Sequence, residues 1–387
     1  MTADGPVVSG SSARAYGWVA HLRAGGTTPW LAWSGPDTPA ATETGPLPGA
    51  QQLELLRRVN LALGSSAQAH RGDDRARARL ADRVLAAPAA GRGQADLPLI
   101  GVSAPGFGPR PVDPSDVSAR ELLRVAAALL ADDLVTLGAD PVSTSWRRPW
   151  RRRFRLVGDP VLVGALRRDL LARGRPEGGP RPLLVAVGAP LDDLLAHTWT
   201  QRCFETGATP WAEWLRYWRE RDQLPARADL LASVRRWNAR RPFVRIVTDL
   251  ERLPRQLGVR ALPPVRVPGA DQAELARRVA AVLGLKVRAH ERPALMRTLQ
   301  RRIPDTGVAP VGVPAREREW VTSSAARMSR GLTRAGYPVV GDLADLAPRE
   351  AWTAAPGPAA AEQQVLDLAV TMLVDPGWRR TEAQVER

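Results

Sequence analysis

Residues 154–174, FRLVGDPVLVGALRRDLLARG, constrain the fold of this 387-residue chain more than any other segment. Their pattern predicts a short apolar strand, a glycine turn and an amphipathic helix that begins at Asp159. Phosphate-cradling units of this kind supply a lysine and Ser or Thr hydroxyls to the anion. Here Asp159, Pro160 and Val161 stand in that place. The segment therefore indicates a fold more firmly than it indicates an activity.

Strand-like and helix-like segments alternate after residue 154. Residues 183–187 and 243–248 are apolar runs, and each precedes a helix-like segment. Continuous apolar strands separated by helices are typical of a parallel sheet covered on both faces. We therefore expect residues 154–350 to form an α/β domain, a three-layer sandwich with a mainly parallel sheet.

The first 140 residues are mainly helical by pattern. Residues 51–64 and 74–87 have helical apolar spacing, and a capping box marks a further helix start at Ser118. Two short apolar runs, residues 30–33 and 97–102, are predicted strands. We expect a helical accessory domain over residues 1–140, with no catalytic constellation.

Two other segments are unlike the rest. Residues 141–153 are rich in Arg, Trp and Pro, and prolines interrupt regular helix, so a linker is predicted there. Residues 351–387 are rich in Ala and Glu and weakly patterned. We expect them to form a C-terminal surface helix or a loose tail.

The formal net charge of +15 raises nucleic acid or another polyanion as a partner. Lys286 is the only lysine, so nearly all of the positive charge is arginine, as in proteins from GC-rich genomes. Dispersed arginines on solvated helix faces are the favoured interpretation. Polyanion binding is the alternative.

Cys203 is the only cysteine, so neither an intramolecular disulfide nor a cysteine-based structural zinc site can form. The four histidines have no metal-ligand spacing, and we expect no metal. The N-terminal segment does not resemble a secretory signal, and no stretch of about 18 apolar residues is present. We expect a cytoplasmic protein without a membrane span.

Four segments of the second half match one family pattern: FRLVGDPVLVGALRRDLLARG, LLVAVGAPLDDLLAHTWTQRCFETGATPWAEWL, PPVRVPGADQAELARRVAAVLGL and VPAREREWVTSSAARMSRGLTRAGYPVVGDLADLAP. Over roughly residues 150–350 the chain resembles the sulfotransferase-like proteins of actinobacteria. The resemblance implies a P-loop-type α/β fold. It also implies transfer of a sulfuryl group from 3′-phosphoadenosine 5′-phosphosulfate (PAPS) to a hydroxyl or amine.

The departures from that family fall on the donor site. In the family, a lysine and hydroxyls of the turn bind the phosphosulfate, whereas aliphatic residues occupy those positions here and the remaining motif residues are Gly158, Pro160 and Gly164. The resemblance implies that Gly158, Asp159, Gly164 and Arg202 are the positions facing a PAPS or PAP cofactor. As an N-cap, Asp159 would occupy the free amides and repel an anion.

Three further features are candidates for chemistry. His197 follows a strand's carboxyl end on a helix, where it could act as a general base; a packing histidine is the favoured alternative. Glu205 is a candidate catalytic carboxylate, with a solvated helix charge as the alternative. Trp211, Trp214 and Trp218 have helical spacing, which suits a sugar site or, more simply, core packing.

These observations lead to three hypotheses. The first is a sulfotransferase-like protein with an eroded PAPS site, acting as a non-catalytic or divergent partner in cell-surface glycan or envelope metabolism. The second is an active sulfotransferase or other group transferase with a glycan or small-molecule acceptor, in which Arg202 and the 158–164 turn bind nucleotide and His197 is the base. The third is a basic polyanion-binding module built on the Arg/Trp-rich linker.

Overall fold

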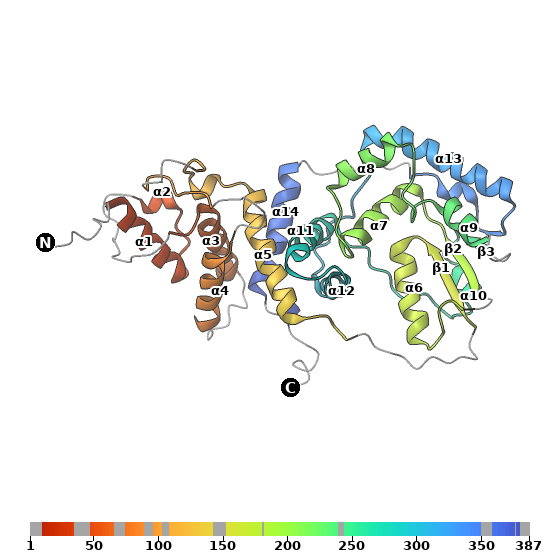
Figure 1. Ribbon diagram of the computed structural model, residues 1–387, viewed down its shortest axis with the longest axis horizontal. Coiled ribbons are helices and arrows are strands. Elements are labelled where there is room, and N and C mark those ends of the chain that lie inside the picture. The colour runs from red at the N-terminus through yellow and green to blue at the C-terminus, as the bar shows by residue number, and fades with distance from the viewer. Residues whose placement is uncertain are drawn as a thin grey trace. The chain divides into compact units, whose positions relative to one another are not determined.

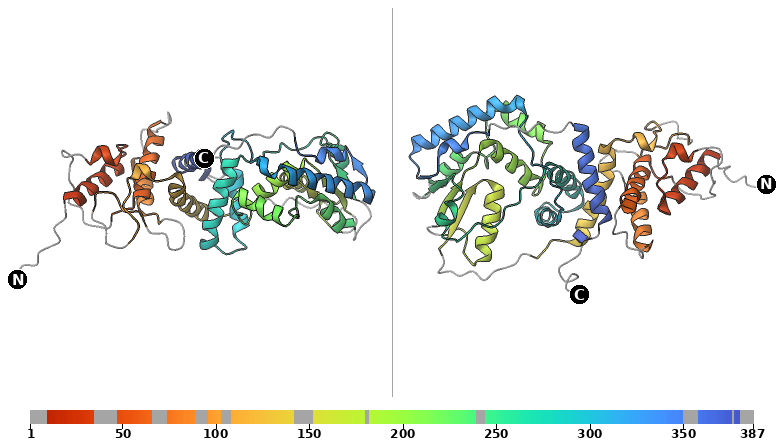
Figure 2. Two further views of the ribbon diagram at one scale, coloured as in Figure 1. Left: turned by 90° about the horizontal axis from the view of Figure 1, so that it is seen from above. Right: turned by 180° about the vertical axis from the view of Figure 1, so that it is seen from behind.

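The structure is a computed structural model in which the chain forms a mixed α/β protein (Figures 1 and 2). It describes residues 10–34, 47–65, 74–88, 96–102, 108–141, 152–179, 182–238, 244–349, 358–375 and 377–379. The chain divides into two compact units. The helical unit comprises Met1–Ala139, Arg278–Pro304 and Gly357–Arg387, and the sheet unit comprises Asp140–Arg277 and Asp305–Pro356. Each unit is thus built from separate stretches of chain, which the linear pattern does not reveal.

The helical unit contains α1 (Gly10–Arg23), α2 (Trp30–Trp33), α3 (Ala50–Ser65), α4 (Asp74–Ala86), η1 (Pro114–Asp116), α5 (Ala119–Leu137), α12 (Arg292–Arg302), α14 (Pro358–Val374) and η4 (Gly377–Arg379). The predicted start of α5 is confirmed, because Ser118 Oγ accepts the amide of Glu121 at 3.4 Å. α14 packs against α5 and buries Leu366, Ala369 and Leu373. The predicted C-terminal helix is therefore present, but it is a core helix rather than a surface helix.

Both strands predicted in the first part of the chain are also wrong. Residues 30–33 form the single helical turn α2, in which the Trp30 ring is buried against Trp18 with ring centroids 5.3 Å apart. Residues 97–102 contribute one isolated bridge, Leu99 to Val112. A short apolar run has no periodicity to separate strand from helix.

The sheet unit contains, in chain order, β1 (Phe154–Gly158), α6 (Pro160–Ala172), β2 (Leu183–Val187), α7 (Leu191–Cys203), α8 (Trp211–Glu220), α9 (Leu230–Asn238), β3 (Val244–Val247), α10 (Leu253–Leu257), η2 (Ala315–Glu317), α13 (Arg318–Ala335), β4 (Val339–Val340) and η3 (Leu343–Leu346). α11 (Ala270–Lys286) begins in this unit and ends in the helical unit. The predicted parallel sheet is confirmed over these strands. Residues 142–151, most of the predicted linker, lie outside the described residues.

The sheet is parallel throughout its four strands, in the order β1-β2-β3-β4. Their last residues are in register across the sheet, since Gly158 pairs with Val187, Val187 with Val247, and Val247 with Val340. The carboxyl ends of all four strands therefore meet at one edge, which we call the carboxyl edge. Of the predicted site residues, Gly158 and Asp159 lie at this edge, at the end of β1.

An apolar core fixes α6 and α10 against the sheet. Alternate strand residues point to it, as expected for period-two side chains, and each fully buried aliphatic side chain contributes about 1.5–3 kcal/mol. The core comprises Phe154, Leu156, Val163, Leu166, Leu170, Leu183, Val185, Val187, Val247, Leu253 and Leu257. The position of α6, and so of its N-terminus, is set by this packing.

Two glycines of the 158–164 turn differ in whether their position has room for a side chain. Gly158 has φ +106°, and a Cβ there would lie 2.0 Å from Val187 O, whereas a Cβ on Gly164 would meet nothing closer than Arg168 Nη1 at 3.8 Å. We expect Gly158→Ala to lower the free energy of unfolding by at least about 2 kcal/mol through backbone strain. Gly164→Ala, inside α6, should raise it by about 0.5–1 kcal/mol. Urea unfolding followed by circular dichroism compares the two, and equal stability of Gly158→Ala and the wild type would contradict the described turn.

Candidate functional site

The carboxyl edge is the place where open α/β sheets hold ligands, at a point where the strand order reverses. The order of the four described strands follows the chain without a reversal. The described strands therefore form no switch-point crevice. What occupies each strand end decides whether a ligand fits.

The end of β1 is closed by the carboxylate of Asp159, the N-cap of α6. Asp159 is fully buried, and its Oδ1 accepts the amides of Val161 at 2.9 Å and Leu162 at 3.0 Å. Free amides at a helix N-terminus are the groups that bind phosphate or sulfate. Here the side chain of the chain's own cap has taken two of them, which confirms the predicted capping.

The second oxygen of Asp159 binds the imidazole of His197. Asp159 Oδ2 lies 2.5 Å from His197 Nδ1, and the His197 side chain is 12% exposed. An ionised carboxylate only accepts hydrogen bonds, so Nδ1 donates and the neutral ring keeps its lone pair on Nε2. The bond ties α6 to α7 and brings together two of the residues predicted from sequence.

A second carboxylate on α7 lies beside this pair. Asp193, one helical turn before His197, is ion-paired with Arg349, which follows η3. Burial raises the pKa of Asp193, Arg349 opposes that rise, and the neighbouring charges of Asp192 and Asp159 add to it. Carboxylates thus dominate this corner, and their field disfavours an anionic ligand.

The ends of the other strands are covered by residues that follow β4. Leu346 of η3 is fully buried, and its Cδ2 would lie 2.9 Å from a Cβ placed on Gly188, directly after β2. After β3, Thr248 Oγ1 lies 2.9 Å from Asp342 O and 2.9 Å from Asp345 Oδ2. Sequence reasoning missed this cover. The glycine and aspartates that follow β4 are a weak signal for it.

The remaining predicted site residues are not joined to this corner by any contact found among the described residues. Gly164 lies inside α6, and Arg202 is exposed in the last turn of α7, more than one turn beyond His197. Glu205, in the turn after α7, pairs with Arg227 at 2.9 Å and accepts from Gln201 Nε2 at 3.1 Å.

The tryptophans of α8 continue a row of rings that starts on α7. Trp199 and Trp211 are 5.5 Å apart, as are Trp211 and Trp214, and Trp218 follows at 6.2 Å. The indole N–H groups of Trp199 and Trp211 donate to the carbonyls of Thr209 and Gly312. These contacts favour the packing interpretation of the row.

Two further checks concern metal and thiol chemistry. The described residues contain no group of His, Cys, Asp and Glu side chains that could hold a metal ion. Cys203 is fully buried, and this burial raises the pKa of its thiol well above the ordinary value. Cys203 is therefore a core residue in its present environment, because the reactive form of cysteine is the thiolate.

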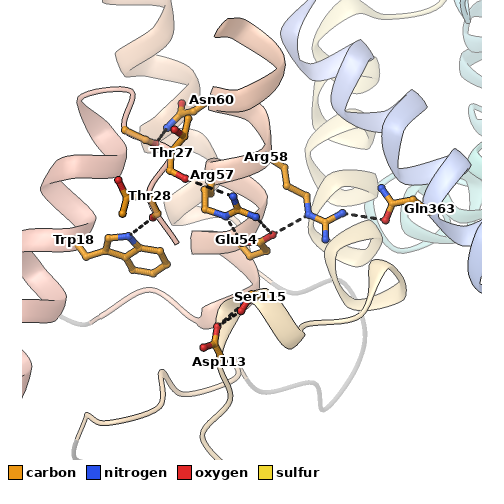
Figure 3. Close-up of polar contacts among 11 residues, drawn as sticks. Trp18, Thr27, Thr28, Glu54, Arg57, Arg58, Asn60, Asp113, Ser115 and Gln363 are labelled. Atoms are coloured by element: carbon orange, nitrogen blue, oxygen red, sulfur yellow. Dashed lines mark hydrogen bonds and ion pairs between the residues drawn. The ribbon is translucent and has the colours of Figure 1, made fainter. Parts of the chain in front are cut away.

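The helical unit has its own buried polar network, which Figure 3 shows around Glu54. Glu54 is almost fully buried and binds Arg57 at 2.7 Å and Arg58 at 2.9 Å, and Arg58 donates to Gln363 of α14 at 3.1 Å. Asn60 donates to the carbonyls of Leu22 and Gly26. Because these polar side chains bind one another or backbone carbonyls, we interpret the network as structural.

Comparisons of the chain with models of known protein families, with curated proteins and with solved structures found no match. No helix in the described part of the chain has both the length and the apolar character needed to cross a bilayer.

The burial of Asp193 predicts how the stability of the protein depends on pH. Because the native state raises the pKa of this carboxyl above its ordinary 3.8, it holds the proton more tightly than the unfolded chain does. As the pH rises from about 3 through the range in which this carboxyl titrates, the free energy of unfolding of the wild type should therefore fall relative to that of Asp193→Asn. Urea unfolding of both proteins at several pH values measures the difference, in which titrating groups distant from Asp193 cancel. A constant difference, or one of opposite sign, would contradict the described burial.

Proposed function

We propose that the sheet unit is a sulfotransferase-like, three-layer P-loop-type scaffold whose donor corner is closed. The chain would then serve as a non-catalytic or divergent binding partner in cell-surface glycan or envelope metabolism. The observation that carries the proposal is the Asp159 carboxylate, which accepts two amides of the α6 N-terminus and binds His197 with its other oxygen.

The corner lacks each element that would hold a phosphosulfate group. Its amides are capped, and the first turn of α6 presents Val161, Leu162 and Val163 where a lysine and hydroxyls would be needed. The charges of Asp192, Asp159, His197 and Arg349 act on the neighbouring Asp193, and among these groups carboxylates predominate.

A nucleotide could enter only by displacing the cap. An N-cap contributes about 0.5–2 kcal/mol, and a hydrogen bond to a charged group contributes about 1.5–3 kcal/mol. Giving up both would weaken donor affinity by roughly 30-fold to 5,000-fold. This cost comes before any repulsion between the donor and Asp159, so the closed corner is the stable state.

Isothermal titration with adenosine 3′,5′-bisphosphate tests the proposal. Wild-type protein should give no saturable heat at millimolar ligand, because the amides that would bind it are occupied. Saturable binding at micromolar concentration would refute the closed corner.

Two substitutions separate occupation of the amides from charge repulsion. Asn is itself an N-cap, so Asp159→Asn should still occupy the amides and still give no heat. Asp159→Gly removes the side chain that occupies the amides, so weak binding of adenosine 3′,5′-bisphosphate should appear. Binding by Asp159→Asn as strong as that of Asp159→Gly would mean that charge, not occupation, closes the corner.

A second candidate is favoured by one observation, the bond that Asp159 makes to Nδ1. A buried carboxylate at Nδ1 orients an imidazole and leaves Nε2 free to accept a proton, as in hydrolase triads. In this alternative His197 is the general base of a group transferase that uses PAPS or another donor. Conversion of PAPS to adenosine 3′,5′-bisphosphate with a panel of hydroxyl acceptors, lost in His197→Gln, would support it.

The polyanion hypothesis gains no support from the described residues. It depends on the Arg/Trp-rich segment, and residues 142–151 of that segment lie outside the described part of the chain.

A further inference from the structure

Residues 341–349, which follow β4, cross the carboxyl edge of the sheet and return to α7. They contain η3 and end at Arg349, the partner of Asp193. This run, which we call the strap, is not part of the Asp159 cap that carries the proposal above. Its contacts differ in kind along its length.

The first part of the strap is firmly held. Leu346 is fully buried, Ser329 Oγ of α13 donates to Leu343 O at 3.1 Å, and Thr248 Oγ1 lies 2.9 Å from Asp342 O. Gly341 has φ +110°, and a Cβ on it would lie 2.2 Å from Thr248 Oγ1, so the chain can enter the strap this closely only through glycine.

The far end is held by a different kind of contact. The Arg349 side chain is 64% exposed and that of Asp193 is 23% exposed. Ion pairs as exposed as this are screened by water and salt and contribute little to stability. The Arg349–Asp193 ion pair, which we call the latch, is therefore a weak contact at the end of a segment that is held in place by the burial of Leu346.

The latch lies on the face of α7 that carries His197. Asp193 and His197 are four residues apart in one helix, so their side chains are neighbours on one face. Arg349 is bound to Asp193 and so lies beside that face, and only 12% of the His197 side chain is exposed.

We propose that residues 341–349 form a releasable strap, whose release at Arg349 and Leu346 uncovers the His197 imidazole to small molecules. The proposal goes beyond the function proposed above, because access to His197 does not require a nucleotide in the Asp159 corner. A ligand or partner that binds the open state better would shift the population toward it.

Carbethoxylation of histidine by diethyl pyrocarbonate, followed peptide by peptide by mass spectrometry on the full chain, measures this access. His290 is exposed and serves as the internal reference for reagent activity. Arg349→Ala removes the latch. Gly188→Ala leaves every charge in place and presses a methyl group against Leu346. Arg334→Ala, an exposed arginine of α13 outside the strap, is the matched control.

We expect Arg349→Ala and Gly188→Ala to raise the rate at His197, relative to His290, by at least threefold, with Arg334→Ala unchanged. Gly188→Ala leaves every charge in place, so an increase shared by both variants cannot come from charge alone. Hydrogen exchange of the amides of residues 341–349 should accelerate in the same two variants.

Rates within twofold of wild type in both variants would overturn the proposal. So would faster exchange in the strap without a change at His197, because the strap would then cover something else. An equal increase in Arg334→Ala would show general loosening and would overturn it as well. If Gly188→Ala does not fold, the comparison of Arg349→Ala with Arg334→Ala decides.

Discussion

The carboxylate of Asp159 holds the candidate site together through three hydrogen bonds. One oxygen caps α6 by accepting two backbone amides, and the other binds His197 Nδ1 at 2.5 Å. Removing a buried charged partner leaves its neighbours unsatisfied, which costs more than the bond itself contributes. Asp159 therefore fixes the first turn of α6, the tautomer of His197 and the distance between two helices at once. It can do so only because Gly158 lets the chain turn beside Val187.

At the rest of the carboxyl edge, too, side chains of the chain itself occupy the strand ends. Leu346 fills the space after β2, and Asp342 and Asp345 engage Thr248 after β3. In a ligand-binding α/β protein these positions stay open, and the ligand supplies the missing partners. Here the chain supplies them itself. The same contacts support the proposal of a closed donor corner.

Local features could be predicted from the sequence, and contacts between distant segments could not. The strand before Gly158 and the cap at Asp159 are properties of consecutive residues, so the pattern predicts them. The Asp159–His197 bond joins residues 38 positions apart and depends on how α6 packs on α7. α14 is a core helix with little amphipathic contrast, so its sequence has no polar stripe to indicate burial. The strap arises more than 140 residues after β2 in the sequence, beyond the reach of any local pattern.

The most direct test of the account follows the Val161 and Leu162 amides themselves. In a ¹H–¹⁵N correlation spectrum of the wild-type protein, titrated with adenosine 3′,5′-bisphosphate, both signals should keep their positions, because Asp159 holds these N–H groups. In Asp159→Gly the same signals should move. A saturable shift of either amide in the wild type would show that the ligand displaces the carboxylate, and would contradict the closed corner.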